Sequence, residues 1–279
     1  RRRASAMSWT ERQRAMLREM GLVTWQPGSR AADPAPAAQP VPAVATPRPV
    51  AGPPARVMQQ AVAPAPPAAA AAAVLDIATD ERTRHIATLD WPALRDAVAG
   101  CQACALCQSR KQTVFGVGDR QARWMIVGEA PGEQEDLSGE PFVGAAGQLL
   151  DSMLRALSLT RRDDGPEPAA QRVYIANTLK CRPPRNRNPQ PSELAACEPF
   201  LMRQLALLQP RLIVAMGRFA VQALLRSSDP VGKLRGKVHQ YQGVPLVVTY
   251  HPAYLLRSLA DKARAWDDLC LAASVAERP

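Results

Sequence analysis

The feature that most constrains the fold is a series of short apolar runs that alternate with helical patterns. The run at Arg123–Gly128 is almost wholly apolar and stops at a glycine, as is typical of a strand buried on both faces of a parallel sheet. The other strands that we expect are Val173–Ala176, Arg211–Met216, Lys237–Tyr241 and Val244–Thr249. The helices that we expect are Trp91–Val98, Ala145–Leu157, Ser192–Leu208, Phe219–Leu225 and Asp261–Ala276. This alternation predicts an α/β fold, a three-layer α/β/α sandwich around a mostly parallel central sheet, with a disordered N-terminal extension.

The N-terminal part of the chain has a different composition. From about Pro27 onward it is dominated by Ala, Pro and Val, and such a stretch buries too little apolar surface to offset the entropy of ordering its backbone. We therefore predict a disordered linker at residues 27–87 and a folded domain at residues 88–279. Residues 1–26 form a short segment in which Ser8–Met20 has the pattern of an amphipathic helix. Arg1–Arg3 are not followed by an apolar stretch, so we expect no secretory signal, and Met7 is a candidate start.

Charge and cysteine content narrow the class of protein. The formal net charge of +10 favours a polyanionic partner, nucleic acid before membrane, although a merely soluble arginine-rich protein has the same charge. No sufficiently hydrophobic stretch predicts a membrane span. We expect a cytoplasmic, reducing setting, in which six cysteines indicate metal or redox chemistry more than disulfides.

The cysteine spacing predicts a metal centre. The segment Cys101-Gln-Ala-Cys104 presents two thiolates from one tight turn, and Cys181 and Cys197 form the other candidate pair. Four thiolates suit either a structural zinc ion or a [4Fe–4S] cluster, and the spacing alone leaves both open. Cys107 continues the first run and competes as a ligand, whereas Cys270 has the surroundings of a small buried hydrophobe.

Three loops follow predicted strands at the sheet edge where α/β proteins bind ligands. The first begins at Gly128 and contains Phe142 among glycines, either as a stacking surface or as a core residue. The second begins at Asn177, whose amide has the geometry to read a base edge. It continues with cations suited to phosphates, although a solvated charge run has the same pattern: Lys180, Arg182, Arg185 and Arg187. The third begins at His251 and continues to Arg257, with Leu255 and Leu256 as candidate wedges or core residues.

These segments together resemble the family 4 uracil-DNA glycosylases. The resemblance covers about Cys101 to the C-terminus, and its motifs occur in family order. They are Cys-x-x-Cys, Gly-Glu-Ala-Pro-Gly-Glu-x-Glu-Asp from Gly128, Pro-Phe-Val-Gly-x-Ala-Gly from Pro141, Asn-x-x-Lys-Cys-Arg-Pro-Pro-x-Asn-Arg from Asn177 and His-Pro-Ala-Tyr-Leu-Leu-Arg from His251. The resemblance implies a [4Fe–4S] cluster on Cys101, Cys104, Cys181 and Cys197, with Cys107 and Cys270 outside the ligand set.

The resemblance also implies a mechanism on a uracil flipped out of DNA. Phe142 would stack on the base, Asn177 would read its polar edge, and His251 would stabilise the leaving anion. Gly128 and Ala130 would complete the base pocket. Glu129 is the first choice for the carboxylate that orients water. Glu135 would organise the loop or the pocket. Better-known uracil glycosylases carry an aspartate at the position of Ala130, which leaves the water-activating carboxylate open.

The same resemblance implies the partners. The DNA contacts would come from Arg182, Arg185, Arg187, Leu255, Leu256 and Arg257. We expect a monomer that acts on uracil in single- or double-stranded DNA near the nucleoid, without membrane association. The N-terminal tail lies outside the resemblance, and our separate hypothesis is a tether that lets residues 8–20 find a repair or replication partner. Some relatives in the same superfamily trap the abasic product covalently through a histidine in an inserted basic loop. No histidine lies between Cys181 and Cys197 in this chain, so we expect ordinary hydrolysis without covalent trapping. The alternatives are a non-catalytic iron–sulfur DNA-binding or redox-sensing module and a zinc-stabilised nucleotide-binding protein.

Overall fold

In a computed structural model, the structure describes residues 81–277 of the 279-residue chain. The predicted amphipathic helix at Ser8–Met20 and the predicted linker up to residue 80 lie outside the described residues. A helix covers residues 81–88, and its Ile86 is buried against Leu94 and Val98. This helix, with its buried Ile86, overlaps the end of the linker that the sequence predicts at residues 27–87.

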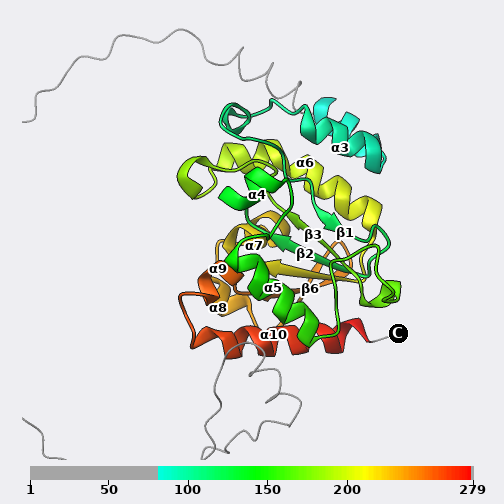
Figure 1. Ribbon diagram of the computed structural model, residues 1–279, viewed down its shortest axis with the longest axis vertical. Helices are drawn as coiled ribbons and strands as arrows, with labels where there is room; N and C mark the ends of the chain where they lie inside the picture. Colours follow the sequence, from blue (N-terminus) through cyan, green and yellow to red (C-terminus); the bar gives the residue numbers. More distant parts are fainter. Residues whose placement is uncertain (1–80, 278–279) are drawn as a thin grey trace, which may run out of the picture. The chain divides into compact units, whose positions relative to one another are not determined.

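The described residues form one six-stranded sheet in the order β1-β3-β2-β4-β6-β5 (Figure 1). The strands are β1 (Val117–Gly118), β2 (Trp124–Gly128), β3 (Val173–Asn177), β4 (Leu212–Met216), β5 (Val238–Tyr241) and β6 (Val244–Thr249). The four inner strands run parallel, and the edge strands β1 and β5 pair antiparallel to their neighbours. The predicted mostly parallel sheet is therefore confirmed.

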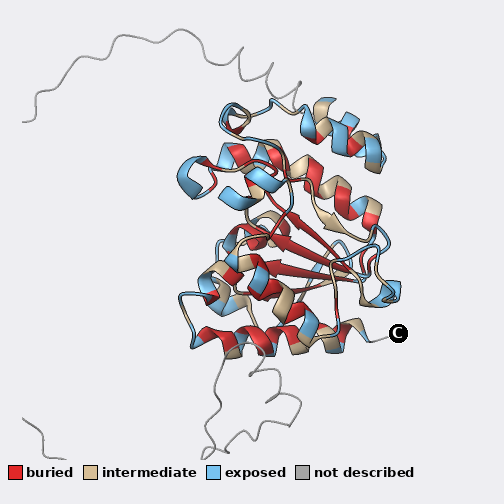
Figure 2. Cartoon of the chain, viewed as in Figure 1, coloured by how far each residue is buried: buried red, intermediate tan, exposed pale blue. Residues whose placement is uncertain are grey.

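Helices cover both faces of this sheet. Helices α5 (Ala145–Ala156) and α10 (Asp261–Ala276) pack on one face, and α6 (Pro191–Leu208) and α7 (Arg218–Leu225) pack on the other. Strand β2 shows the consequence, because Trp124 and Ile126 enter the first core while Met125 and Val127 enter the second. Every residue of the inner strands β2, β3 and β4 is buried, which explains their continuous apolar sequences (Figure 2). The predicted α/β sandwich is thus confirmed.

A third apolar cluster lies outside the two main cores. It joins α3 (Trp91–Ala99) and the 3-10 turn η1 (Ala105–Gln108) to the first half of α6, and it includes Cys181 and Cys197. The cysteines therefore hold the start of the domain against the loop that follows β3.

Apart from the helix at residues 81–88, the sequence predicted the long elements and missed most of the short ones. The short helix α9 (Pro252–Leu255) begins at the proline that indicated a helix start. The short elements that were missed are β1, α4 (Glu133–Ser138), α8 (Val231–Leu234) and the 3-10 turns η1, η2 (Ala169–Gln171) and η3 (Pro184–Asn186). None of these spans more than six residues, which is too short for a hydrophobic period to repeat. None of the helices at residues 81–277 has the length and apolar character needed to span a bilayer.

Candidate active site

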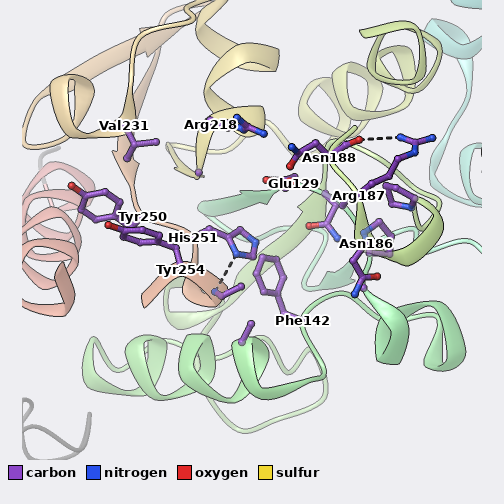
Figure 3. A pocket seen from close by; sticks show the side chains of 18 of the residues that line it. Glu129, Phe142, Asn186, Arg187, Asn188, Arg218, Val231, Tyr250, His251 and Tyr254 are labelled. Carbon is purple, nitrogen blue, oxygen red and sulfur yellow. Dashed lines mark hydrogen bonds between the residues drawn. The ribbon is translucent and has the colours of Figure 1, made fainter. Parts of the chain in front are cut away.

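A cleft of about 760 Å³ opens at the carboxyl ends of the parallel strands (Figure 3). The register places Gly128 beside Asn177 at the ends of β2 and β3, and the next two strand ends contribute Arg218 and His251. Because parallel strands end at one edge of a sheet, four loops distant in sequence meet around this cleft.

Phe142 and Asn177 line the cleft, and Gly128 packs directly against both side chains. A Cβ atom at Gly128 would lie 2.4 Å from Asn177 Oδ1 and 2.5 Å from Phe142 Cζ, so this position accepts no larger residue. Phe142 itself has a left-handed φ of 57° and is 5 % exposed. The backbone of Phe142 packs against α5 at Gly147, where an added Cβ would collide with the Phe142 carbonyl oxygen. The sequence left Phe142 open between core and stacking surface, and the structure places it in both, since it packs on α5 and lines the cleft.

Asn177 presents a polar group without a partner. Its side chain is 2 % exposed, and Oδ1 has no hydrogen-bond donor within the described part of the chain. A buried polar atom without a partner costs about 1–3 kcal/mol. An N–H donor in the cleft would remove that cost, so the site is shaped for a ligand that donates here.

His251 is held as a neutral ring. It is the N-cap of α9, where Nδ1 accepts a hydrogen bond from the Ala253 amide at 3.2 Å. The proton of the neutral ring is therefore on Nε2, which leaves this nitrogen as a donor. Burial lowers the pKa of His251 to about 4, although Glu135 nearby opposes that shift. The ring also stacks on Phe142, with centroids 5.3 Å apart and an interplanar angle of 27° (Figure 3).

The two loop carboxylates have different surroundings. Glu135 Oε2 accepts from the Gly132 amide at 3.0 Å, and Oε1 accepts from the amides of Val143 and Gly144 at 3.1 and 3.3 Å. With three backbone donors bound, this carboxylate ties the loop after β2 to the loop that carries Phe142.

Glu129 is free to act on a ligand or on water. Its carboxylate makes no hydrogen bond or ion pair with any residue from 81 to 277, and it lines the cleft beside Ala130. Burial raises the pKa of Glu129, and the charge of Arg218 opposes the shift. Of the two carboxylates, Glu129 has the environment of a proton acceptor.

The cationic loop after β3 is only partly available to a ligand. Arg187 pairs with the buried Glu193 through two hydrogen bonds, of which Nη1 to Oε2 measures 2.9 Å. Arg182 Nε donates to Asn186 Oδ1 at 2.8 Å, and its Nη1 lies 3.7 Å from Glu133 Oε1. Arg185 is exposed on the turn η3, at a left-handed φ of 55°. Among the three, Arg185 is therefore the most accessible cation.

The two candidate wedge leucines, Leu255 and Leu256, differ in their burial. Leu255 is fully buried in the core beneath α5 and α10, so its interpretation as a DNA contact is wrong. Leu256 is 43 % exposed one residue later, and the neighbouring Arg257 lines the cleft. The end of α9 turns one leucine inward and the other outward, so Leu256 remains the candidate wedge.

The sequence missed the fourth strand end. The cleft is also lined by Arg218 and by the aromatic pair Tyr250 and Tyr254. The positive charge of Arg218 acts on the Glu129 carboxylate and favours its ionised form. The signal was present, because Met216-Gly217 ends β4 with the same apolar-to-glycine pattern as β2. Gly217 has a φ of 89°, and an added Cβ would lie 3.2 Å from His251 Cβ.

All four predicted metal ligands line one small cavity, together with the fifth cysteine, Cys107. Three N–H groups donate to these sulfurs, namely Arg82 to Cys101, Arg110 to Cys181 and the Lys180 amide to Cys197, at 3.6, 3.2 and 3.2 Å. Such donors stabilise thiolates, as metal binding requires.

The cysteine cavity has the chemistry of a metal site. Four thiolates suit either a structural zinc ion or a [4Fe–4S] cluster, and the cavity lining is compatible with both.

Comparison with known proteins agrees with this geometry. The model of the "Uracil DNA glycosylase superfamily" matches residues 115–270. A "Type-4 uracil-DNA glycosylase" of Pyrobaculum aerophilum is 41 % identical over 193 residues, which cover 66 % of this chain and 93 % of that protein. A protein of the same description from Thermotoga maritima is 41 % identical over 171 residues, covering 61 % of this chain and 84 % of the relative. A "Type-5 uracil-DNA glycosylase" of Pyrobaculum aerophilum is 36 % identical over 148 residues, covering 50 % and 64 %.

Proposed function

Because this chain belongs to the uracil DNA glycosylase superfamily, we propose that it excises uracil from DNA and leaves an abasic site. The observation that carries the proposal is the convergence of Phe142, Asn177 and His251 on one cleft at the sheet edge. These three groups supply a stacking surface, a base-reading amide and a neutral N–H donor. The relatives' descriptions name the same activity.

The unpartnered oxygen of Asn177 supports recognition of uracil. Uracil carries an N3–H donor beside the O4 acceptor, so an amide can accept from N3 and donate to O4 at once. Cytosine presents a bare ring nitrogen at N3, which would leave Asn177 Oδ1 buried and unpaired. Stacking on Phe142 contributes about 1–3 kcal/mol without regard to base identity. Gly128 lets both side chains pack against the end of β2, because an added Cβ would collide with each of them.

The chemistry follows from the charge that develops in the reaction. As the C1′–N1 bond breaks, its electron pair stays on the uracil ring, and His251 donates Nε2–H to the resulting anion. A neutral imidazole suits this role, because it stabilises the anion without having to release a proton. Glu129 orients a water molecule toward C1′ and takes its proton, and Glu135 holds the loop that carries Phe142. Ala130 takes no part in this chemistry, because it has no carboxylate where better-known uracil glycosylases carry an aspartate.

The DNA contacts lie around the mouth of the cleft. Arg185 and Arg257 would contact phosphates, Leu256 would fill the space left by the flipped base, and Arg182 would act from the same loop. Arg187 serves the fold first, since Glu193 holds it at the start of α6.

The cysteine cavity would hold a [4Fe–4S] cluster on Cys101, Cys104, Cys181 and Cys197. The shared cavity and its N–H donors support this assignment. When bound, the group would supply a structural link, because glycosidic hydrolysis transfers no electrons. That link would fix the cationic loop against α3 and α6.

The activity is tested with an end-labelled oligonucleotide that contains one uracil. Incubation with cluster-loaded protein, followed by alkali, should cleave the strand at uracil and leave a matched thymine strand intact. Absence of cleavage by a brown, iron-containing sample would contradict the proposal and favour a non-catalytic binding module. Comparison of single strands with U:G and U:A duplexes would establish the preferred substrate.

The remaining parts of the proposal concern partners. We propose that the protein acts as a monomer in the cytoplasm and that residues 8–20 recruit a repair or replication partner. Deletion of residues 1–80, which keeps the helix at residues 81–88 and its buried Ile86, tests the recruitment. The deleted protein should excise uracil normally in vitro and lose its localisation to DNA-repair sites, whereas unchanged localisation would refute a role for this segment.

A further inference from the structure

A buried lysine lies between the cysteine cavity and the uracil-reading residue. Lys180 is 1 % exposed, although lysine is rarely found inside a protein without an ionic partner. Its Nζ donates to the Asn177 carbonyl oxygen at 2.9 Å and to Gln204 Oε1 at 2.6 Å. Asn177 and Lys180 stand at the end of β3, and Gln204 comes from α6 on the adjacent face.

The orientation of Gln204 is fixed by the rest of the network. Its Nε2 donates to the Phe115 carbonyl oxygen at 2.9 Å and to the Tyr174 hydroxyl at 3.2 Å. The amide oxygen must therefore face Lys180. Because Gln204 is fully buried, the hydrogen bond that it accepts from Lys180 is shielded from solvent.

The hydrogen-bond partners of Lys180 Nζ are neutral, so its charge needs compensation from elsewhere. No carboxylate lies within ion-pair distance of Lys180 in the described part of the chain. The backbone amide of Lys180 donates to Cys197 Sγ at 3.2 Å, and Cys181 is the next residue. Lys180 also lines the cysteine cavity. Metal-bound thiolates would provide the negative charge that a buried ammonium group requires.

From this geometry we propose that Lys180 is a positioning residue, which fixes Asn177 for uracil recognition and is itself held by the cysteine loop. The proposal rests on the proposed uracil-excising function. In the same network, Lys180 satisfies the Asn177 carbonyl, while the Asn177 side chain keeps its oxygen unpaired for the base. Loss of the ammonium group would leave that carbonyl without its donor, and the strand end would relax away from the cleft.

The test compares Lys180→Met with the matched control Gln204→Leu. Both changes remove one polar group from the same buried network, but Gln204→Leu keeps the bond from Lys180 to Asn177. The measurements are inhibition of excision by free uracil, kcat and KM on a uracil oligonucleotide, and iron content. We expect Lys180→Met to bind free uracil about tenfold more weakly with full iron content, and Gln204→Leu to stay within about twofold of the wild type.

Each other outcome has a definite meaning. Equal loss of uracil inhibition in both variants, or unchanged inhibition in Lys180→Met, would overturn the positioning role. If Lys180→Met does not fold, Lys180→Gln replaces it, because its shorter neutral amide should weaken uracil inhibition while filling the space. Wild-type inhibition by Lys180→Gln would again overturn the proposal. Failure of the wild type to release uracil would refute the proposed function itself, which separates the two failures.

Discussion

His251 combines a low proton affinity with a fixed tautomer. The Ala253 amide occupies Nδ1, and burial lowers the ring's pKa to about 4, so the ring is neutral at physiological pH with its proton on Nε2. In the unfolded chain the histidine pKa is near the ordinary 6.5. Between pH 6.5 and 4 the unfolded state therefore binds the proton and the folded state does not. Burial of His251 thus makes the protein lose stability as the pH falls through this range.

The first residue-scale prediction concerns His251→Ala. The change removes the donor to the leaving anion, and we expect kcat to fall by about 10²–10³ with a smaller change in DNA affinity. Single-turnover excision and a DNA-binding assay measure the two effects. The control is His239→Ala, because His239 bonds to the Leu234 carbonyl on the edge strand β5, away from the cleft. Equal rates for both variants would remove His251 from the mechanism.

The second residue-scale prediction concerns the pH profile. Burial raises the pKa of Glu129, and only its ionised form accepts a proton, so excision should slow on the acidic side as Glu129 becomes protonated. The limb should lie above the ordinary glutamate value of 4.5. Glu129→Gln should lower kcat and abolish that limb, and the exposed Glu140→Gln should keep it. Persistence of the limb in Glu129→Gln would assign it to another group.

At the scale of an element, the segment from β6 through α9 determines which side chains are buried and which are exposed beside the cleft. Pro252 sits at the first turn of α9, where its missing N–H has no cost, and His251 caps that turn. One turn later the chain leaves the helix, with Leu255 in the core and Leu256 outside. Four helical residues thus fix both the His251 ring and Leu256 relative to β6.

The element-scale prediction separates the two leucines. Leu256→Ala should leave the free energy of unfolding within about 0.5 kcal/mol of the wild type, as for other exposed sites. It should slow excision from duplex DNA more than from single strands, because the gap in a duplex is what the side chain fills. Leu255→Ala should instead destabilise the fold by about 2–5 kcal/mol, since it leaves a cavity in the core. Denaturant unfolding and excision rates on both substrates distinguish these effects.

At the scale of the whole molecule, two arrangements cooperate. The parallel sheet gathers four loops at one edge, while the cysteine cavity joins α3, η1 and α6 to the loop after β3. The cysteine cavity lies outside the two main cores. With the proposed cluster bound, it would add a link that apolar packing alone does not provide, and it would anchor the loop between Cys181 and Cys197 at both ends.

The whole-molecule prediction follows from this link. Cys197→Ser should lose iron and its visible absorbance. Its free energy of unfolding should fall by about 3 kcal/mol, which corresponds to a decrease in Tm of roughly 6–12 °C. Cys270→Ser, in the last helix α10, should retain iron because Cys270 lies apart from the cavity. Iron analysis and thermal unfolding provide the measurements. Full iron in Cys197→Ser would exclude Cys197 from the ligands, and Cys107, which lines the same cavity, would become the candidate.

The sequence by itself determined the sheet, its long helices and the set of chemical loops. Local patterns carry this information, because a buried strand needs a continuous apolar run and a covering helix needs an apolar stripe. The motifs around Gly128, Asn177 and His251 identified the family, and the sheet topology placed them together as the strand order requires.

The tertiary structure decided which side chains are available for chemistry. Glu135 accepts hydrogen bonds from three loop amides, Arg187 pairs with Glu193, and Leu255 is buried in the core. Residues of the same type lie near each of them in the sequence, so the sequence alone does not show which ones are available. The same holds for Lys180, which reads as one more cation of a basic loop but lies buried between β3 and α6. These outcomes depend on contacts between segments far apart in the chain. A local pattern fixes which element forms, whereas burial and pairing are fixed when the elements pack.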